Sequence, residues 1–330
     1  DEQIVLGAGG FVPHAASTVL ATRFGDCKDH VMLLQALLSA KGINSSPALI
    51  SVGSSFELPR AATPYTFNHV ITYIPKFHLF ADSTAQYAPF GILPGADGGR
   101  PVLLTATGEQ LITPAPESAD NRISVVEKIA ISPDGNATGD STISAQGAAA
   151  VDLRGLVSSI SESQEGEYFR SMLGPGAEGS LKRGDPNALT PNYSYTSHYT
   201  VSDVANFPGP GALPPWIGYK PFYLTEYIAG SLPPSRSLPY VCPSVTAEED
   251  VTIALPNSVQ ITSMPHSSTM SAPGVSLQIS TEKVGANGVH QVTTVRIDHT
   301  GAVCTADYYN SVHDSLKKMV AALKEQILYQ

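Results

Sequence analysis

The chain has 330 residues, of which 42 % are hydrophobic and 15 % are charged, and its net charge is −10. The length allows two domains with separate cores, and the composition is typical of a folded, loop-rich protein with much β-structure. The negative charge argues against a nucleic-acid partner and gives no attraction to an anionic membrane, and we expect no membrane span because no apolar run reaches about eighteen residues.

The first strongly patterned segment is a helix that starts near Asp26. Apolar residues recur there at helical spacing, namely Val31, Leu34, Leu37 and Leu38. Asp26 is a suitable N-cap, and Gly42 is a suitable residue beyond the helix end. Residues 1–24 read as an approach segment, and strands are expected over 47–53, 67–74 and 77–81. A helix followed by antiparallel strands predicts an α+β fold for this part.

A polar, Pro-rich stretch at 113–121 marks the expected domain boundary, which gives domains over 1–115 and 116–330. In the second domain, Pro133-Asp134-Gly135-Asn136 predicts a hairpin between two strands. Helices are expected over 148–160 and 166–173, a loop over 174–192, strands over 193–201, 219–229, 249–255, 275–283 and 289–299, and a final helix over 306–328. This domain is therefore expected to be β-rich, with a helix pair and a C-terminal helix.

The three cysteines divide into one early and two late residues. Cys242 and Cys304 lie in the β-rich half, far from Cys27. Pairing of the two late cysteines would imply an oxidising compartment, whereas two separate buried thiols would not. We predict the pair.

Three residues of the first domain form a pattern with chemical meaning. Cys27 lies in Gly-Asp-Cys-Lys-Asp, His69 ends Phe67-Asn68-His69 at 42 residues further on, and Asp82 follows His69 by 13 residues. A thiol is only a few per cent ionised at neutral pH, so a nucleophilic cysteine needs a base and a group that orients the base. At the first turn of a helix, the free backbone N–H groups would also stabilise the thiolate form of Cys27.

These segments resemble the bacterial transglutaminase-like proteins, in particular the group that carries a β-rich domain of unknown function before the core. The close similarity covers about residues 10–90 and includes Val12-Pro13, Gly25 to Asp29, Phe67-Asn68-His69 and Ala81 to Thr84. The resemblance implies a papain-like core in which a helix bearing the cysteine packs on an antiparallel sheet. It also implies an N-terminal domain that is missing here, and a periplasmic, cell-surface or secreted location. The start at Asp1 agrees with a processed or excised fragment.

The resemblance further implies an activity and its residues. Cys27 would form a thioester with a peptide or protein amide, His69 would act as its base and acid, and Asp82 would orient His69. We expect hydrolysis rather than cross-linking, with no cofactor and, since the histidines show no ligand spacing, no metal. The alternative is a non-catalytic envelope or surface module that uses the same scaffold for binding. A third possibility is that the missing N-terminal part completes the site.

Overall fold

The structure is a computed structural model and describes residues 12–53, 56–59, 66–213, 218–219 and 232–330. The chain divides into two compact units. The first consists of Asp1–Pro116 together with Thr300–Val303, and the second consists of Glu117–His299 and Cys304–Gln330. Sheets dominate both units and helices are few, so the chain is a sheet-rich mixture of helices and strands, in agreement with the expected α+β class.

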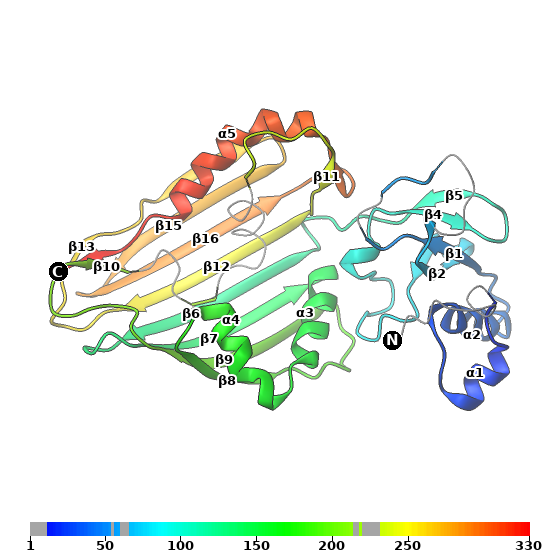
Figure 1. Cartoon of the computed structure of the whole chain (residues 1–330), viewed down its shortest axis with the longest axis horizontal. Helices are drawn as coiled ribbons and strands as arrows, with labels where there is room; N and C mark the ends of the chain where they lie inside the picture. Colours follow the sequence, from blue (N-terminus) through cyan, green and yellow to red (C-terminus); the bar gives the residue numbers. More distant parts are fainter. Residues whose placement is uncertain (1–11, 54–55, 60–65, 214–217, 220–231) are drawn as a thin grey trace. The chain divides into compact units, whose positions relative to one another are not determined.

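The first unit is a five-stranded antiparallel sheet with two helices (Figure 1). The helices are α1 (Ala16–Thr22) and α2 (Cys27–Ser39). The strand order is β3-β2-β1-β4-β5, with β1 (Ser46–Ile50), β2 (His69–Ile74), β3 (Leu79–Ala81), β4 (Pro101–Leu104) and β5 (Gln110–Ile112). Single 3-10 turns are η2 (Pro75–Phe77) and η3 (Gly95–Asp97).

Packing of α2 on the sheet fixes the centre of this unit. Helix α2 packs against β2 and β1. Strand β1 alternates between buried and half-buried residues, whereas β2 is buried at every position after His69. Because β2 is buried on both of its faces, other parts of the protein must cover it on both sides. The first residues of α2 and β2, Cys27 and His69, therefore belong to elements that pack directly on one another.

The second unit is built on an eight-stranded sheet of order β14-β15-β16-β12-β6-β7-β9-β8, in which only β12 and β6 run parallel. Its strands are β6 (Arg122–Ile131), β7 (Ala137–Gln146), β8 (Ala177–Arg183), β9 (Asn192–Val201), β12 (Val245–Ala254), β14 (Ser268–Ala272), β15 (Val275–Val284) and β16 (Gly288–Ile297). Shorter strands are β10 (Gly211–Ala212), β11 (Tyr240–Val241), β13 (Ile261–Ser263), β17 (Val303–Cys304) and β18 (Leu328–Tyr329).

Helices cover both ends of this sheet. Figure 1 shows α5 (Ala306–Leu323) along the β14–β15 end, and α3 (Ala148–Ser159) and α4 (Glu165–Leu173) near β7, β9 and β8. A 3-10 turn, η4 (Glu162–Gln164), precedes α4. The apolar side chains of α5 belong to the core: Val312, Leu316, Met319 and Val320 are buried, and Leu323 packs against the same cluster.

Several predicted elements are confirmed, and others need correction. The hairpin around Pro133-Asp134-Gly135-Asn136 joins β6 to β7, and the helix pair is present. The loop expected over 174–192 contains β8, a mostly exposed edge strand whose polar residues show no apolar alternation. Helix α5 ends at Leu323 and not near 328, because Leu328–Tyr329 pairs with β10 and β13. The strand expected over 219–229 lies, apart from Tyr219, outside the described residues.

Among the described residues, no helix has both the length and the apolar character that a bilayer crossing requires.

Candidate functional site

The first turn of α2 is held by a reciprocal cap. Asp26 is the N-cap, as predicted: its side chain accepts a hydrogen bond from the Asp29 backbone N–H, and the Asp29 carboxylate accepts one from the Asp26 N–H at 3.2 Å. The helix ends at Ser39, and Gly42 follows in a left-handed conformation, with φ of 69°. Cys27 is the first residue of the helix and is half-buried, so it can be reached from outside.

Asp29 is buried, and it ties the turn to an earlier segment. Its carboxylate accepts a hydrogen bond from the backbone N–H of His14 at 2.7 Å and pairs with the His14 ring at 3.0 Å. Burial by itself would raise the pKa of Asp29, but the bonds from His14 and Asp26 lower it. Gly25 is required for this arrangement, because a β-carbon there would lie 2.6 Å from the Asp29 Cβ.

The two carboxylates beside Cys27 therefore each have a cationic or polar partner. Asp26 forms an ion pair with Lys28, and Asp29 is bonded to His14. Without such partners, Asp26 and Asp29 would disfavour a thiolate at Cys27.

Asn68 fixes the start of the strand that carries His69. Its side-chain oxygen accepts from the Val52 N–H at 2.7 Å, and its amide donates to the Val52 carbonyl at 2.7 Å. This two-bond contact continues the β1–β2 pairing beyond Ile50 and His69. The Asn68 side chain thus aligns the strand that carries His69 by bonding the Val52 backbone. This structural role accounts for Asn68 without a part in catalysis.

The structure brings Cys27, His69 and Asp82 together. His69 Nε2 lies 3.1 Å from Asp82 Oδ2, and the Cys27 side chain lies close enough to the His69 ring to affect its pKa. Because Nε2 is engaged with Asp82, Nδ1 is the ring nitrogen left for Cys27. Burial would lower the pKa of His69, yet hydrogen bonding to Asp82 and Cys27 and their negative charge raise it to about 10.

Asp82 is held from its other side by Thr84. The Thr84 N–H and hydroxyl donate to Asp82 Oδ1 at 2.8 and 2.7 Å. Burial would raise the pKa of Asp82, but the bonds from His69 and Thr84 and the charge of His69 lower it. The Asp-Ser-Thr segment is therefore a turn in which the carboxylate is fixed by its own backbone and aimed at the histidine.

A second carboxylate, which the sequence did not indicate, lies in the same place. Asp97 is the last residue of η3 and is 2 % exposed. One of its carboxylate oxygens lies within 4.8 Å of a ring nitrogen of His69 and of a carboxylate oxygen of Asp82. Burial and the charge of Asp82 raise the pKa of Asp97 to about 7, against the opposing charges of His69 and Arg100. Its surroundings in the sequence, Pro94 to Gly99, are typical of an exposed turn, so no local signal marks it.

An apolar groove runs between α1 and α2. It has a volume of 380 Å³ and begins one helical turn from Cys27, at His30. His30 Nδ1 lies 3.0 Å from the Ser83 carbonyl, next to Asp82. The rest of its wall is largely apolar and includes Val19, Leu20, Phe24, Leu33, Leu34 and Leu37. The groove supplies apolar surface close to the cysteine.

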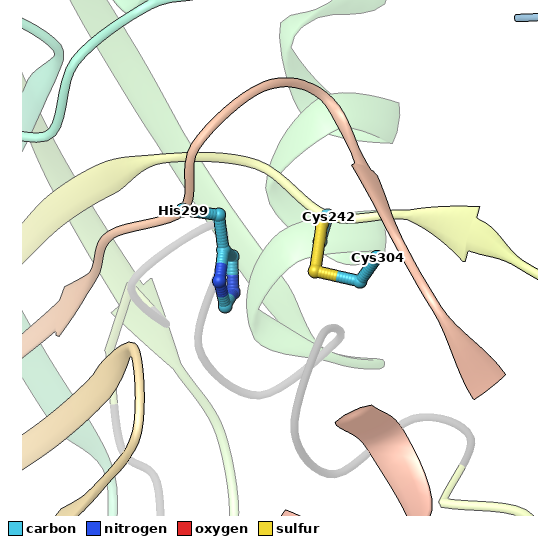
Figure 2. A group of neighbouring side chains, drawn as sticks. All are labelled: Cys242, His299 and Cys304. Carbon is cyan, nitrogen blue, oxygen red and sulfur yellow. A yellow bond between two sulfur atoms is a disulfide. The ribbon is translucent and has the colours of Figure 1, made fainter. Parts of the chain in front are cut away.

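Two groups among the described side chains bring metal-ligand atoms close together. The first is His69, Asp82 and Asp97; the second is Cys242, His299 and Cys304 (Figure 2). Cys242 and Cys304 form a disulfide, as predicted, and sulfurs bonded to one another are not thiolate ligands. In the first group, His69 Nε2 is bonded to Asp82. We assign neither group as a metal centre, and the expectation of no metal stays a prediction.

Comparison with known proteins gives little to add. No protein-family model and no curated protein matches the chain. One solved structure, from Parabacteroides distasonis and described as a candidate protease, is similar with 13 % identity and a TM-score of 0.47; the similarity covers 95 % of this chain and 45 % of that one. The chain thus spans less than half the length of that protein. A likeness at this level indicates nothing about activity, so the function is inferred from the geometry of the site.

Proposed function

We propose that this protein is a cysteine-dependent acyl-transfer enzyme of the transglutaminase-like type, acting on peptide or protein amides. The observation that carries the proposal is the chain of contacts from Cys27 to His69 to Asp82. A helix that starts at the cysteine and packs on an antiparallel sheet bearing the histidine also agrees with the papain-like core that the sequence resemblance implies.

The chemistry follows from the charges of the three groups. With His69 protonated, Cys27 is held as a thiolate beside an imidazolium, and the thiolate attacks the amide carbonyl. The C–N bond breaks as His69 gives its proton to the leaving amine, which leaves a thioester on Cys27. Water then gives a proton to His69 and attacks the thioester, so that the acid is released and the thiolate–imidazolium pair is restored. Asp82 keeps the imidazolium in place in both steps.

The start of α2 can stabilise the negative charge that develops on the carbonyl oxygen during attack. The first backbone N–H groups of a helix have no partner inside the helix and favour negative charge. The Cys27 N–H can therefore donate to the oxyanion.

We favour water over an amine as the acceptor of the acyl group. Cys27 is half-buried, so water reaches the thioester without a second substrate site. The groove along α2 would contact an apolar side chain of a bound peptide. The Cys242–Cys304 disulfide supports a location outside the reducing cytoplasm, such as the periplasm or the cell surface.

The test is the pH dependence of Cys27 alkylation by iodoacetamide, read by peptide mass spectrometry. In the wild type, labelling should persist well below the range of an ordinary thiol. In His69→Ala it should slow by about tenfold or more at neutral pH, because the partner that holds the thiolate is gone. The matched control is His78→Asn: His78 is a histidine of the same unit, in a left-handed conformation that asparagine tolerates, and it should not change labelling.

Labelling that is slow and identical in the wild type and in His69→Ala would contradict the proposal and favour the non-catalytic binding module. If the expected result is obtained, peptide amides should be screened with and without an added primary amine. Release of acid alone indicates hydrolysis, and a new amide indicates cross-linking.

A further inference from the structure

Two buried carboxyl groups face one another beside His69. The Asp82 side chain is 6 % exposed and Asp97 is 2 % exposed. A carboxylate oxygen of each residue and a ring nitrogen of His69 all lie within 4.8 Å of one another. At this separation the charge of Asp82 opposes ionisation of Asp97. Two ionised carboxylates have no proton to share, so a hydrogen bond between them requires that one is protonated.

The contacts of the two residues indicate which one keeps the proton. Asp82 accepts three hydrogen bonds, two from Thr84 and one from His69, and these bonds stabilise its ionised form. Asp97 Oδ2 is buried and has no hydrogen-bond partner among the described residues. An ionised Asp97 would leave part of its charge unsolvated, so Asp97 is the group that stays neutral.

Hydrogen bonds hold the backbone around Asp97 in place, so the fold itself keeps Asp97 next to Asp82. The Thr113 hydroxyl donates to the Asp97 carbonyl at 2.5 Å and accepts from the Arg100 N–H at 2.8 Å. Arg100 Nε donates to the Ala96 carbonyl at 3.0 Å. These bonds tie η3 to the segment just after β5 (Gln110–Ile112).

We propose that Asp97 is a positioning residue that shares its proton with Asp82, so that Asp82 remains the single anion facing His69. This inference rests on the proposed function and adds a fourth residue to its site. Asp97 touches neither Cys27 nor the bond to be cleaved. It acts through Asp82, by donating to the oxygen atoms that orient the histidine.

The arrangement makes the site sensitive to pH near neutrality. The charged groups that face Asp97 are Asp82, His69 and Arg100. When Asp97 loses its proton, its hydrogen bond to Asp82 is lost and a second anion is added next to the first. The two carboxylates then repel each other, and His69 holds its proton more tightly, which opposes transfer to the leaving amine.

The decisive test is a titration of the wild-type protein with ¹³C-labelled aspartate, followed by NMR. One side-chain carboxyl should titrate near pH 7, and the ring nitrogens of His69 should shift with it. Both changes should be absent in Asp97→Asn. Asp140→Asn, which removes an exposed partner of His198, should leave both in place.

Alkylation of Cys27 gives a second readout that a merely structural role would not move. Asparagine keeps an N–H donor toward Asp82, whereas leucine fills the space without one. At neutral pH we expect Asp97→Asn to label at a rate within about threefold of the wild type and Asp97→Leu to be slower by about tenfold.

Either of two results would overturn the inference. One is that no carboxyl titrates near neutrality, or that such a titration persists in Asp97→Asn. The other is that the Asn and Leu variants label at equal rates. If instead the titration is seen but wild-type Cys27 labels like an ordinary thiol, the proton-sharing pair stands and the proposed function fails.

Discussion

Asp82 Oδ2 lies 3.1 Å from His69 Nε2, and this single contact determines which ring nitrogen is left for the cysteine. With Nε2 engaged, Nδ1 is the nitrogen that serves Cys27. His69 is the first residue of β2, and its ring is held by the turn after β3, so its orientation follows from the pairing of these two strands.

Replacing the charge of Asp82 should release the proton of His69. In Asp82→Asn a neutral amide takes the place of the carboxylate, so the pKa of His69 should fall from about 10 toward its ordinary value. A titration of the His69 ring nitrogens by ¹⁵N NMR measures this. Asp140→Asn is the control, and an unchanged His69 pKa in Asp82→Asn would show that the contact does not hold the proton.

The raised pKa of His69 also makes a prediction about stability. A histidine whose pKa is higher in the folded than in the unfolded state contributes stability that is fully present below the unfolded value and is lost as the pH rises through the folded value, here about 10. The unfolding free energy of the wild type should exceed that of His69→Gln by on the order of 1–3 kcal/mol more at about pH 6 than at about pH 10. Urea denaturation at the two pH values measures it, and a constant difference contradicts it.

Gly25→Ala should disturb the turn that presents Cys27. The new β-carbon would meet the Asp29 Cβ at 2.6 Å, and Asp29 holds both the helix cap and His14. We expect a loss of about 1–3 kcal/mol in thermal or chemical unfolding, together with slower Cys27 alkylation. Gly166→Ala in α4 is the control, since its β-carbon would meet only the flexible end of Arg170; equal losses in both variants would refute the argument.

A buried carboxylate in the second unit makes a separate prediction. Glu127 is 1 % exposed and accepts hydrogen bonds from Tyr199 at 2.7 Å, from Ser141 and from the Tyr219 N–H. Burial raises its pKa while these donors lower it. Tyr199→Phe removes one donor and should cost about 1.5–3 kcal/mol in stability. Tyr308→Phe, which frees only an exposed carbonyl, should cost less, and the reverse order would count against this account.

Reduction of the disulfide should destabilise the second unit. Cys242 and Cys304 are 62 residues apart, and a closed loop of that size restrains the unfolded chain by about 4 kcal/mol in the chain-entropy account. We expect a reductant to lower the unfolding midpoint in a Cys27→Ala background, in which no other thiol interferes. A midpoint that does not change would mean that the bridge adds no stability.

How far the sequence predicts the site depends on the reach of each signal. Asp26, Cys27 and the start of α2 follow from local capping and periodicity, and the alternating segments around His69 predict its strand. Asp97 could not be predicted, because Thr113, His69 and Asp82, which surround it, are distant in the sequence, while its own neighbours read as a surface turn. Short elements such as α1, β4 and β8 were missed for a similar reason: tertiary pairing, not propensity, makes them regular.

Four residues from late in the chain, Thr300–Val303, belong to the first unit. Gly99, with φ of 66°, has no room for a side chain because Ala302 lies against it, 2.6 Å from where a β-carbon would be. During synthesis the first unit therefore waits for residue 303 before it is complete. A gene fragment that stops at the boundary after Pro116 would therefore encode a first unit that lacks four of its residues.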